Sequence, residues 1–114
     1  MLLDHRTYVC RPGTLKKQMA LYQEHGWAAQ TEHLGLPLAY LTTETGDVNC
    51  YVHIWVYEDA ADRARRRAAM QADPRWIAFL EKSAEAGYLV SQENRLMTPV
   101  PFAPAPVRPT KAGA

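Results

Sequence analysis

The sequence has little of several features that would point to a particular class of protein. Its 114 residues include only two cysteines, and 13 Lys and Arg are balanced by 12 Asp and Glu. One pair of cysteines without zinc-ligand spacing predicts no zinc site, and a net charge of +1 gives no general attraction to nucleic acid or anionic lipid. No apolar run approaches the ~20 residues of a membrane-spanning helix. We therefore expect neither a nucleic-acid partner nor a membrane partner.

Local signatures of catalysis are also missing. The sequence has no glycine-rich phosphate loop, no Ser-His-Asp order and no H-x-x-x-H spacing, so we expect neither a bound cofactor nor a metal. The N-terminal segment carries charges inside its short apolar stretch, which argues against a signal peptide. These features predict a cytoplasmic protein in which Cys10 and Cys50 stay reduced. A bridge between these two thiols is the alternative, since their strands are expected to be neighbours.

What the sequence does contain is a regular alternation of strands and helices. Alternating β-favouring residues predict strands, and apolar residues at helical spacing predict helices. The predicted strands are residues 2–10, 38–45, 48–57 and 88–97, and the predicted helices are residues 14–34, interrupted at Gly26, 59–72 and 74–86. This β-α-β-β-α-β order is that of the ferredoxin-like sandwich, so we predict an α+β fold.

Proline is concentrated near the C-terminus. Five prolines fall between Pro99 and Pro109, which excludes a regular helix or a central strand there. We divide the chain into a ferredoxin-like domain at residues 1–102 and a Pro-rich tail at residues 103–114, which we expect to be flexible.

One face of the predicted sheet needs a cover that the helices cannot supply. Strand 48–57 places Val52 and Ile54 on one face and Tyr51 and Trp55 on the other. We expect the aliphatic face to lie under the helices and the aromatic face to be open. Large apolar faces are rarely left in water, so the simplest cover is the same sheet of a second copy. The prediction is a homodimer, a dimeric α+β barrel.

The interior of that barrel is the predicted site. Strand alternation places one set of polar and aromatic side chains there, namely Arg6, Tyr8, Tyr40, Tyr51, His53 and Trp55. Aromatic walls with a few polar groups are typical of a small-molecule site. His53 is a candidate catalytic residue that would move a proton. Arg6 is a second candidate, able to hold a carboxylate or a developing negative charge, and the remaining four are candidate ligand-binding residues.

Each of these residues also has a structural interpretation. His53 could instead bond its neighbours in a packed interior, and Arg6 could form an ion pair with Glu44, Glu93 or Asp4. The aromatic side chains could simply fill a dimer core. A cavity of roughly several hundred Å³ beside His53 would favour ligand binding, whereas a filled interior would favour the structural interpretation.

Six segments in order resemble the NIPSNAP family and cover residues 5–102. They are H-R-T-Y, R-P-G-T-L, L-A-Y-L-T-T-E-T-G, V-H-I-W-V-Y-E-D, R-R-R-A-A-M-Q-A-D-P-R-W-I-A-F-L and Q-E-N-R-L-M-T-P. The resemblance implies the dimeric α+β barrel. Related barrel families include cofactor-free isomerases and monooxygenases, so it favours a protein that binds or transforms a small oxygen-bearing or aromatic molecule. A non-catalytic dimeric interaction protein is the alternative.

Overall fold

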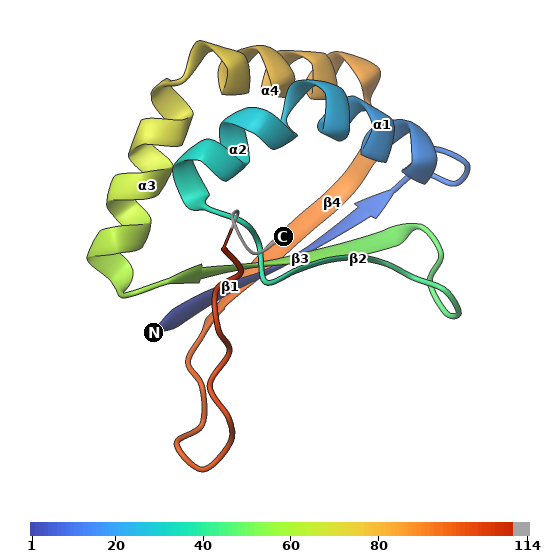
Figure 1. Cartoon of the computed structure of the whole chain (residues 1–114). Coiled ribbons are helices and arrows are strands. Elements are labelled where there is room, and N and C mark those ends of the chain that lie inside the picture. The colour runs from blue at the N-terminus through green and yellow to red at the C-terminus, as the bar shows by residue number, and fades with distance from the viewer. Residues whose placement is uncertain (111–114) are drawn as a thin grey trace.

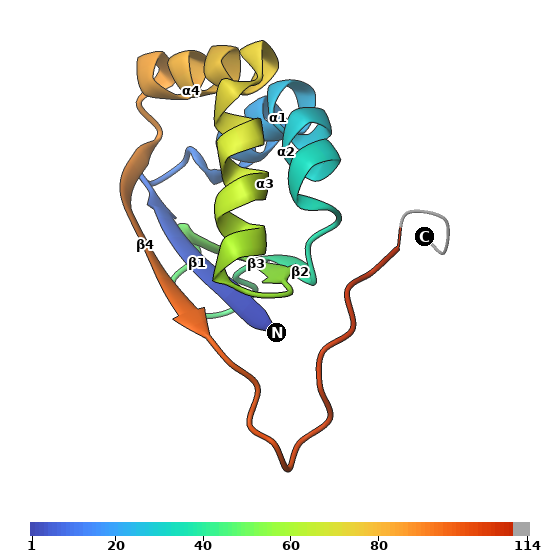
Figure 2. The same ribbon diagram turned by 90° about the vertical axis from the view of Figure 1, so that its left-hand side faces the viewer.

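The computed structural model describes residues 1–110, and its elements follow the predicted order (Figure 1). They are β1 (Leu2–Cys10), α1 (Leu15–His25), α2 (Trp27–Leu34), β2 (Ala39–Thr42), β3 (Cys50–Tyr57), α3 (Ala60–Ala72), α4 (Pro74–Ala86) and β4 (Leu89–Met97). The strands form one antiparallel sheet in the order β2-β3-β1-β4. All four helices lie on the same side of it (Figure 2). The predicted ferredoxin-like α+β fold is confirmed, with each crossover divided into two helices.

Local sequence signals explain where the later helices begin and end. The Asp59 carboxylate accepts a hydrogen bond from the Asp62 backbone N–H at 2.8 Å and caps α3. Asp73 caps α4 in the same way, with Pro74 in the first helical position. Gly87, with φ of 66°, ends α4 in the left-handed conformation. The predicted boundaries of both helices are confirmed.

The hairpin between β2 and β3 is longer than the alternating pattern predicted. β2 ends at Thr42 and β3 begins at Cys50. The residues between them do not extend the strand pairing, because they form a turn with hydrogen bonds of its own. The Asp47 carboxylate accepts from the Asn49 backbone N–H at 3.0 Å, and Gly46 has φ of 114°. Such an Asx turn competes with the strand ladder.

The structure reverses the predicted roles of the two sheet faces. Tyr51, His53 and Trp55 are at most 3% exposed and lie under the helices, whereas Val52 and Ile54 lie on the open face. Period-2 alternation separates two faces but does not say which one the helices cover. The helices offer buried polar partners such as glutamine side chains, which hydroxyl and imidazole groups need and aliphatic groups do not.

The core therefore consists largely of aromatic rings between the sheet and the helices. Its buried members are Tyr22, Ala29, Leu34, Trp55, Tyr57, Met70, Trp76 and Phe79. The opposite face of the sheet carries aliphatic side chains together with His5, Glu93 and Arg95, and Leu41 on it is 53% exposed. None of the helices within residues 1–110 is both long and apolar enough to cross a bilayer.

The two cysteines do not form a bridge. Both are free thiols, and Cys50 pairs in register with Val9 rather than with Cys10. Successive residues of a strand point to opposite faces, so the side chain of Cys10 lies on the helix side of the sheet while that of Cys50 lies on the open side.

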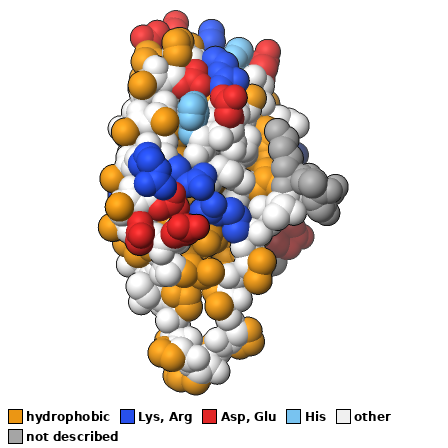
Figure 3. Space-filling view, turned by 60° about the vertical axis from the view of Figure 1, so that its left-hand side comes forward, with side chains coloured by type: hydrophobic (Ala, Val, Ile, Leu, Met, Phe, Trp, Pro, Cys, Tyr) orange, Lys and Arg blue, Asp and Glu red, His pale blue; other side chains and the backbone are white. Residues whose placement is uncertain are grey.

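After β4 the chain forms an extended arm, residues 98–107, that leaves the sheet and turns back toward it (Figures 1 and 2). Where the arm comes back to the sheet, the Arg108 guanidinium donates a hydrogen bond to the backbone carbonyl of Val56. Hydrophobic side chains gather at the tip of the arm (Figure 3), and Phe102 is 92% exposed. The flexibility predicted for residues 103–114 stays a prediction, and residues 111–114 lie outside the described part of the chain.

Replacing Gly26 by Ala tests the close approach at the joint between α1 and α2. A Cβ on Gly26 would lie 2.8 Å from Cδ1 of Tyr22 and 3.2 Å from the ring of Phe79. We expect Gly26→Ala to lower the free energy of unfolding by about 1–3 kcal/mol, measured by urea denaturation. Helix propensity alone predicts the opposite sign, a gain of about 0.5–1 kcal/mol, so a stabilised variant would contradict the packing described here.

Candidate functional site

A small pocket lies between the sheet and the helices, beside His53. Its volume is about 70 Å³, and it extends from this buried imidazole to the exposed side chains of Leu80 on α4 and Gln92 on β4. Its walls combine residues from all four strands and from α1, α2 and α4, namely Tyr8, Gln18, Tyr22, Gln30, Tyr40, Tyr51, His53, Trp76, Phe79, Leu80, Ser83, Leu89 and Gln92. The site is therefore inside one protomer and not in the predicted barrel between two.

An outer groove adjoins this pocket. It has a volume of about 250 Å³ and is lined by Met19, Tyr22, Gln23, Trp27 and Tyr40. Tyr22 and Tyr40 line both spaces, and their rings are stacked with centroids 5.1 Å apart. The stacked pair is thus a shared wall. The inner pocket alone is smaller than the several hundred Å³ that would by itself favour ligand binding.

The imidazole of His53 is fixed on three sides. Its ring stacks on Tyr40 at 4.7 Å and lies 4.9 Å from the ring of Tyr8. The indole Nε1–H of Trp55 donates to His53 Nδ1 at 2.6 Å. Burial, assisted by the positive charge of Arg6, lowers the pKa of His53 to about 3. A neutral histidine with so low a pKa is a weak general base at neutral pH, so the predicted proton-moving role has no support in this geometry.

The tyrosine hydroxyls that line the pocket beside His53 are uncharged as well. Burial raises the pKa of Tyr22, Tyr40 and Tyr51 well above the ordinary value, so their hydroxyls stay protonated. The Gln18 amide donates from Nε2 to the Tyr51 hydroxyl at 3.5 Å. Within residues 1–110 its Oε1 is buried without a hydrogen-bond partner. One end of this amide therefore lacks the hydrogen-bond donor that a buried carbonyl oxygen normally has.

Arg6 lies next to the pocket but does not line it. Its guanidinium donates to the Asp4 carboxylate and to the Tyr8 hydroxyl, both at 3.2 Å. Asp4 is fully buried and also accepts from Arg63 at 3.1 Å and from Asn94 at 2.9 Å. Burial alone would raise the pKa of Asp4, but these hydrogen bonds and the nearby guanidinium charges outweigh it and hold that pKa below its usual value. Of the interpretations left open for Arg6, the ion pair with Asp4 is the one observed.

The structure thus brings together four of the six predicted site residues. Tyr8, Tyr40, Tyr51 and His53 line the pocket, whereas Trp55 lies behind it in the core. Sequence reasoning missed the helical side of the site, above all Gln18. A signal was present, because Gln18 interrupts the apolar face formed by Leu15, Met19 and Tyr22 on α1. A polar residue on a buried helix face needs a partner.

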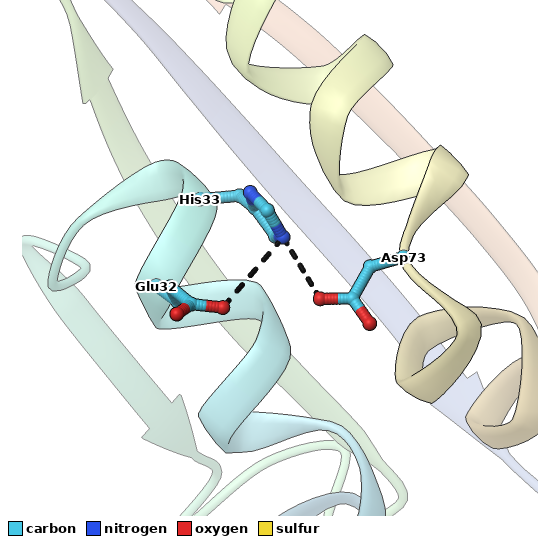
Figure 4. A group of neighbouring side chains, drawn as sticks. All are labelled: Glu32, His33 and Asp73. Atoms are coloured by element: carbon cyan, nitrogen blue, oxygen red, sulfur yellow. Dashed lines mark hydrogen bonds and ion pairs between the residues drawn. The ribbon is translucent and has the colours of Figure 1, made fainter.

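One other group of side chains has the spacing of metal ligands. Glu32, His33 and Asp73 place ligand atoms within 4.8 Å of one another where α2 meets the start of α4 (Figure 4). His33 Nε2 lies 2.9 Å from the Asp73 carboxylate. Arg75 donates to both Asp73 and Glu32, so a guanidinium already supplies the positive charge that a metal would bring. The group is an ion-pair network that joins two helices.

The fold and the pocket together define a class, a ferredoxin-like α+β protein with an uncharged, aromatic-walled pocket between its sheet and its helices. The NIPSNAP family model matches residues 3–104. The chain therefore belongs to the NIPSNAP family, which confirms the resemblance carried by the six segments.

Curated relatives match different shares of the chain. A NipSnap homolog of Dictyostelium discoideum is 32% identical over 95 residues, which is 83% of this chain and 41% of that protein. NipSnap homolog 3B of Homo sapiens is 40% identical over 62 residues, which is 54% of this chain and 24% of that protein. The chain spans less than half the length of these curated relatives.

Solved structures extend the comparison to the fold. A NIPSNAP-like domain protein of Burkholderia xenovorans has a TM-score of 0.85 and 32% identity, covering 99% of this chain and 97% of that one. A NIPSNAP family protein of Agrobacterium tumefaciens, described as having unknown function, has a TM-score of 0.82 and 36% identity, covering 91% and 92%. An antibiotic biosynthesis monooxygenase shares the fold alone, with a TM-score of 0.61, 21% identity and coverage of 89% and 100%.

The low pKa of His53 makes stability depend on pH in a defined direction. The unfolded chain takes up a proton on this histidine near pH 6.5, whereas the folded chain does so only near pH 3. Stability is therefore lost as the pH falls below about 6.5. We expect the free energy of unfolding to fall by about 2 kcal/mol from this group between pH 7 and pH 5.

The measurement compares urea denaturation of the native chain and of His53→Phe at both pH values. The other three histidines are common to both proteins, so the difference in pH dependence isolates His53. The same loss in both proteins would show that His53 is not held neutral in the folded state.

Proposed function

We propose that this protein binds a small, flat, oxygen-bearing molecule in the pocket between the sheet and the helices. The observation that carries the proposal is Gln18 Oε1, a buried hydrogen-bond acceptor without a donor, on the wall of an aromatic pocket that reaches the surface at Leu80 and Gln92. The hydroxyl group of an oxygen-bearing ligand would supply that donor. Proteins rarely leave a buried polar group unpaired without a functional reason. Aromatic walls with few polar groups suit a planar organic molecule.

Binding is better supported than catalysis by the groups present. His53 is neutral and the tyrosine hydroxyls stay protonated, so the described lining offers no strong base at neutral pH. The monooxygenase with the same fold supports a site for a small organic molecule only by analogy of architecture. Chemistry of the cofactor-free monooxygenase or isomerase kind would require reactivity from the bound molecule itself.

Blocking the pocket tests this proposal. Ser83 lines the pocket on α4, and Ser83→Phe would fill it, whereas the neighbouring Ala84 is exposed and Ala84→Phe would leave it open. We expect native mass spectrometry of the purified protein to show a retained small molecule on the unmodified chain and on Ala84→Phe, and none on Ser83→Phe. A bare unmodified chain, or a molecule still retained by Ser83→Phe, would contradict the proposal.

We also propose that the protein forms a homodimer through the open face of its sheet. That face carries half-buried Leu3, Val52 and Ile54 and exposed Leu41. Beside it, the arm of residues 98–107 helps to form an apolar groove of about 340 Å³ that includes Leu3 and Ile54. Uncovered apolar residues grouped on one face are characteristic of contact surfaces, and a second copy presents a face of the same kind.

A pair of isoleucine substitutions distinguishes the two sides of the protomer. Ile54 lies on the open face, and Ile77 is 44% exposed on α4 on the other side. Light scattering of the native chain should give twice the 12.9 kDa chain mass. We expect Ile54→Glu to give a monomer, because a glutamate would be buried without a partner, and Ile77→Glu to remain a dimer. A native monomer, or a dimer that survives Ile54→Glu, would overturn this proposal.

A further inference from the structure

We infer that His53 recognises an uncharged, planar carbonyl compound by donating a hydrogen bond from Nε2–H to its carbonyl oxygen. The inference rests on the proposed function and deepens it, because it names both the class of ligand and the protein atom that selects it.

The hydrogen bond from Trp55 determines which nitrogen of His53 carries the proton. An indole Nε1–H can only donate, so the His53 Nδ1 that lies 2.6 Å from it must be the acceptor. A protonated Nδ1, whether in the other neutral tautomer or in the imidazolium ion, is incompatible with this contact. A neutral imidazole carries one ring proton, and that proton is therefore on Nε2.

The donor at Nε2 has no acceptor within the described part of the chain. The only hydrogen bond that His53 makes with residues 1–110 is the one at Nδ1, and the ring lines the pocket. Tyr40 and Tyr8 pack on the ring, so it has little freedom to turn away. An N–H group on a ring that lines the pocket takes its acceptor from outside the chain, either a ligand oxygen or water.

The charges around the pocket exclude an anionic ligand. The 13 described residues that line it include no Asp, Glu, Lys or Arg. The nearby guanidinium of Arg6 is already engaged by Asp4 and the Tyr8 hydroxyl. Burying a carboxylate beside neutral groups without a counter-ion is costly. The acceptor oxygen is therefore that of a neutral group, of which a carbonyl is the strongest common example.

The parallel side-chain rings on strands β2 and β3 indicate a flat ligand. Tyr40 and His53 are within 9° of parallel, and Tyr51 is within 18° of both, with ring centroids 4.7 to 6.0 Å apart. Aromatic ketones, aldehydes, quinones and amides combine this shape with a neutral carbonyl. The inner volume of about 70 Å³ admits the carbonyl end of such a molecule, with its ring directed along the mouth.

Three probes of nearly the same shape test the inference on the full chain. Acetophenone offers the carbonyl oxygen, α-methylstyrene replaces that oxygen by CH₂, and benzoate adds a negative charge. The protein is labelled with ¹⁵N, and long-range ¹H–¹⁵N spectra report the His53 tautomer and follow each titration at neutral pH. We expect the Nε2–H tautomer, a shift of that signal with acetophenone, and binding of acetophenone about 10-fold tighter than of either other probe.

Two variants connect the preference to the proposed atoms. His53→Phe keeps a ring between Tyr40 and Tyr8 but has no donor, so acetophenone and α-methylstyrene should bind within about 2-fold of each other. Trp55→Phe keeps His53 but releases Nδ1, so the spectra should show both tautomers and the preference should weaken. His25→Phe, on α1 and outside the pocket, is the control and should retain the full preference.

Each contrary result has a distinct meaning. An Nδ1–H tautomer or an imidazolium at neutral pH would overturn the inference directly. Equal binding of acetophenone and α-methylstyrene, or tighter binding of benzoate, would overturn the donor role and leave the proposed binding function standing. If none of the probes shifts the His53 signal, the carbonyl class is wrong, and native mass spectrometry of the Ser83→Phe pair separately decides whether the pocket binds anything.

Discussion

The hydrogen bond from Trp55 Nε1 to His53 Nδ1 is the interaction on which the character of this site depends. It satisfies two polar groups that burial would otherwise penalise, and it leaves His53 with one proton at Nε2. Without it, the imidazole could offer either a lone pair or a proton to the pocket. With it, His53 becomes a fixed donor in a pocket whose lining contains no Asp, Glu, Lys or Arg, which favours recognition of a ligand oxygen over proton transfer.

The polar network at the other end of β1 supports this arrangement without entering the pocket. Asp4 is fully buried and is balanced by Arg6, Arg63 and Asn94, which join β1, β4 and α3. Burial is the main cause of the lowered pKa of His53, and the positive charge of Arg6, held close by this network, disfavours the imidazolium further. A residue predicted to bind a ligand anion thus acts on the site by keeping it neutral. The negative charge of Asp4 acts in the opposite direction and raises the pKa of His53, but burial and Arg6 outweigh it.

Much of the fold could be predicted from the sequence because its signals are local. Asp73-Pro74 and Gly87 mark the limits of α4, and six ordered segments identify the family. The site depended on a non-local choice, namely which sheet face the helices cover, and alternation along β3 does not contain that information. The helices supply Gln18 as a partner for Tyr51, so the aromatic face turns inward. The pocket residues on the strands could be grouped from sequence, but their location could not.

We propose that the ligand-binding pocket lies between the sheet and the helices, and that His53 recognises the ligand there through its Nε2–H. A crystal structure of the full chain soaked with acetophenone tests it most directly. The account predicts the bound ring in the inner pocket or its mouth, with the carbonyl oxygen about 3 Å from His53 Nε2 and Trp55 still bonded to Nδ1. Acetophenone bound only on the open face of the sheet, or in the pocket with its oxygen directed away from His53, would contradict it.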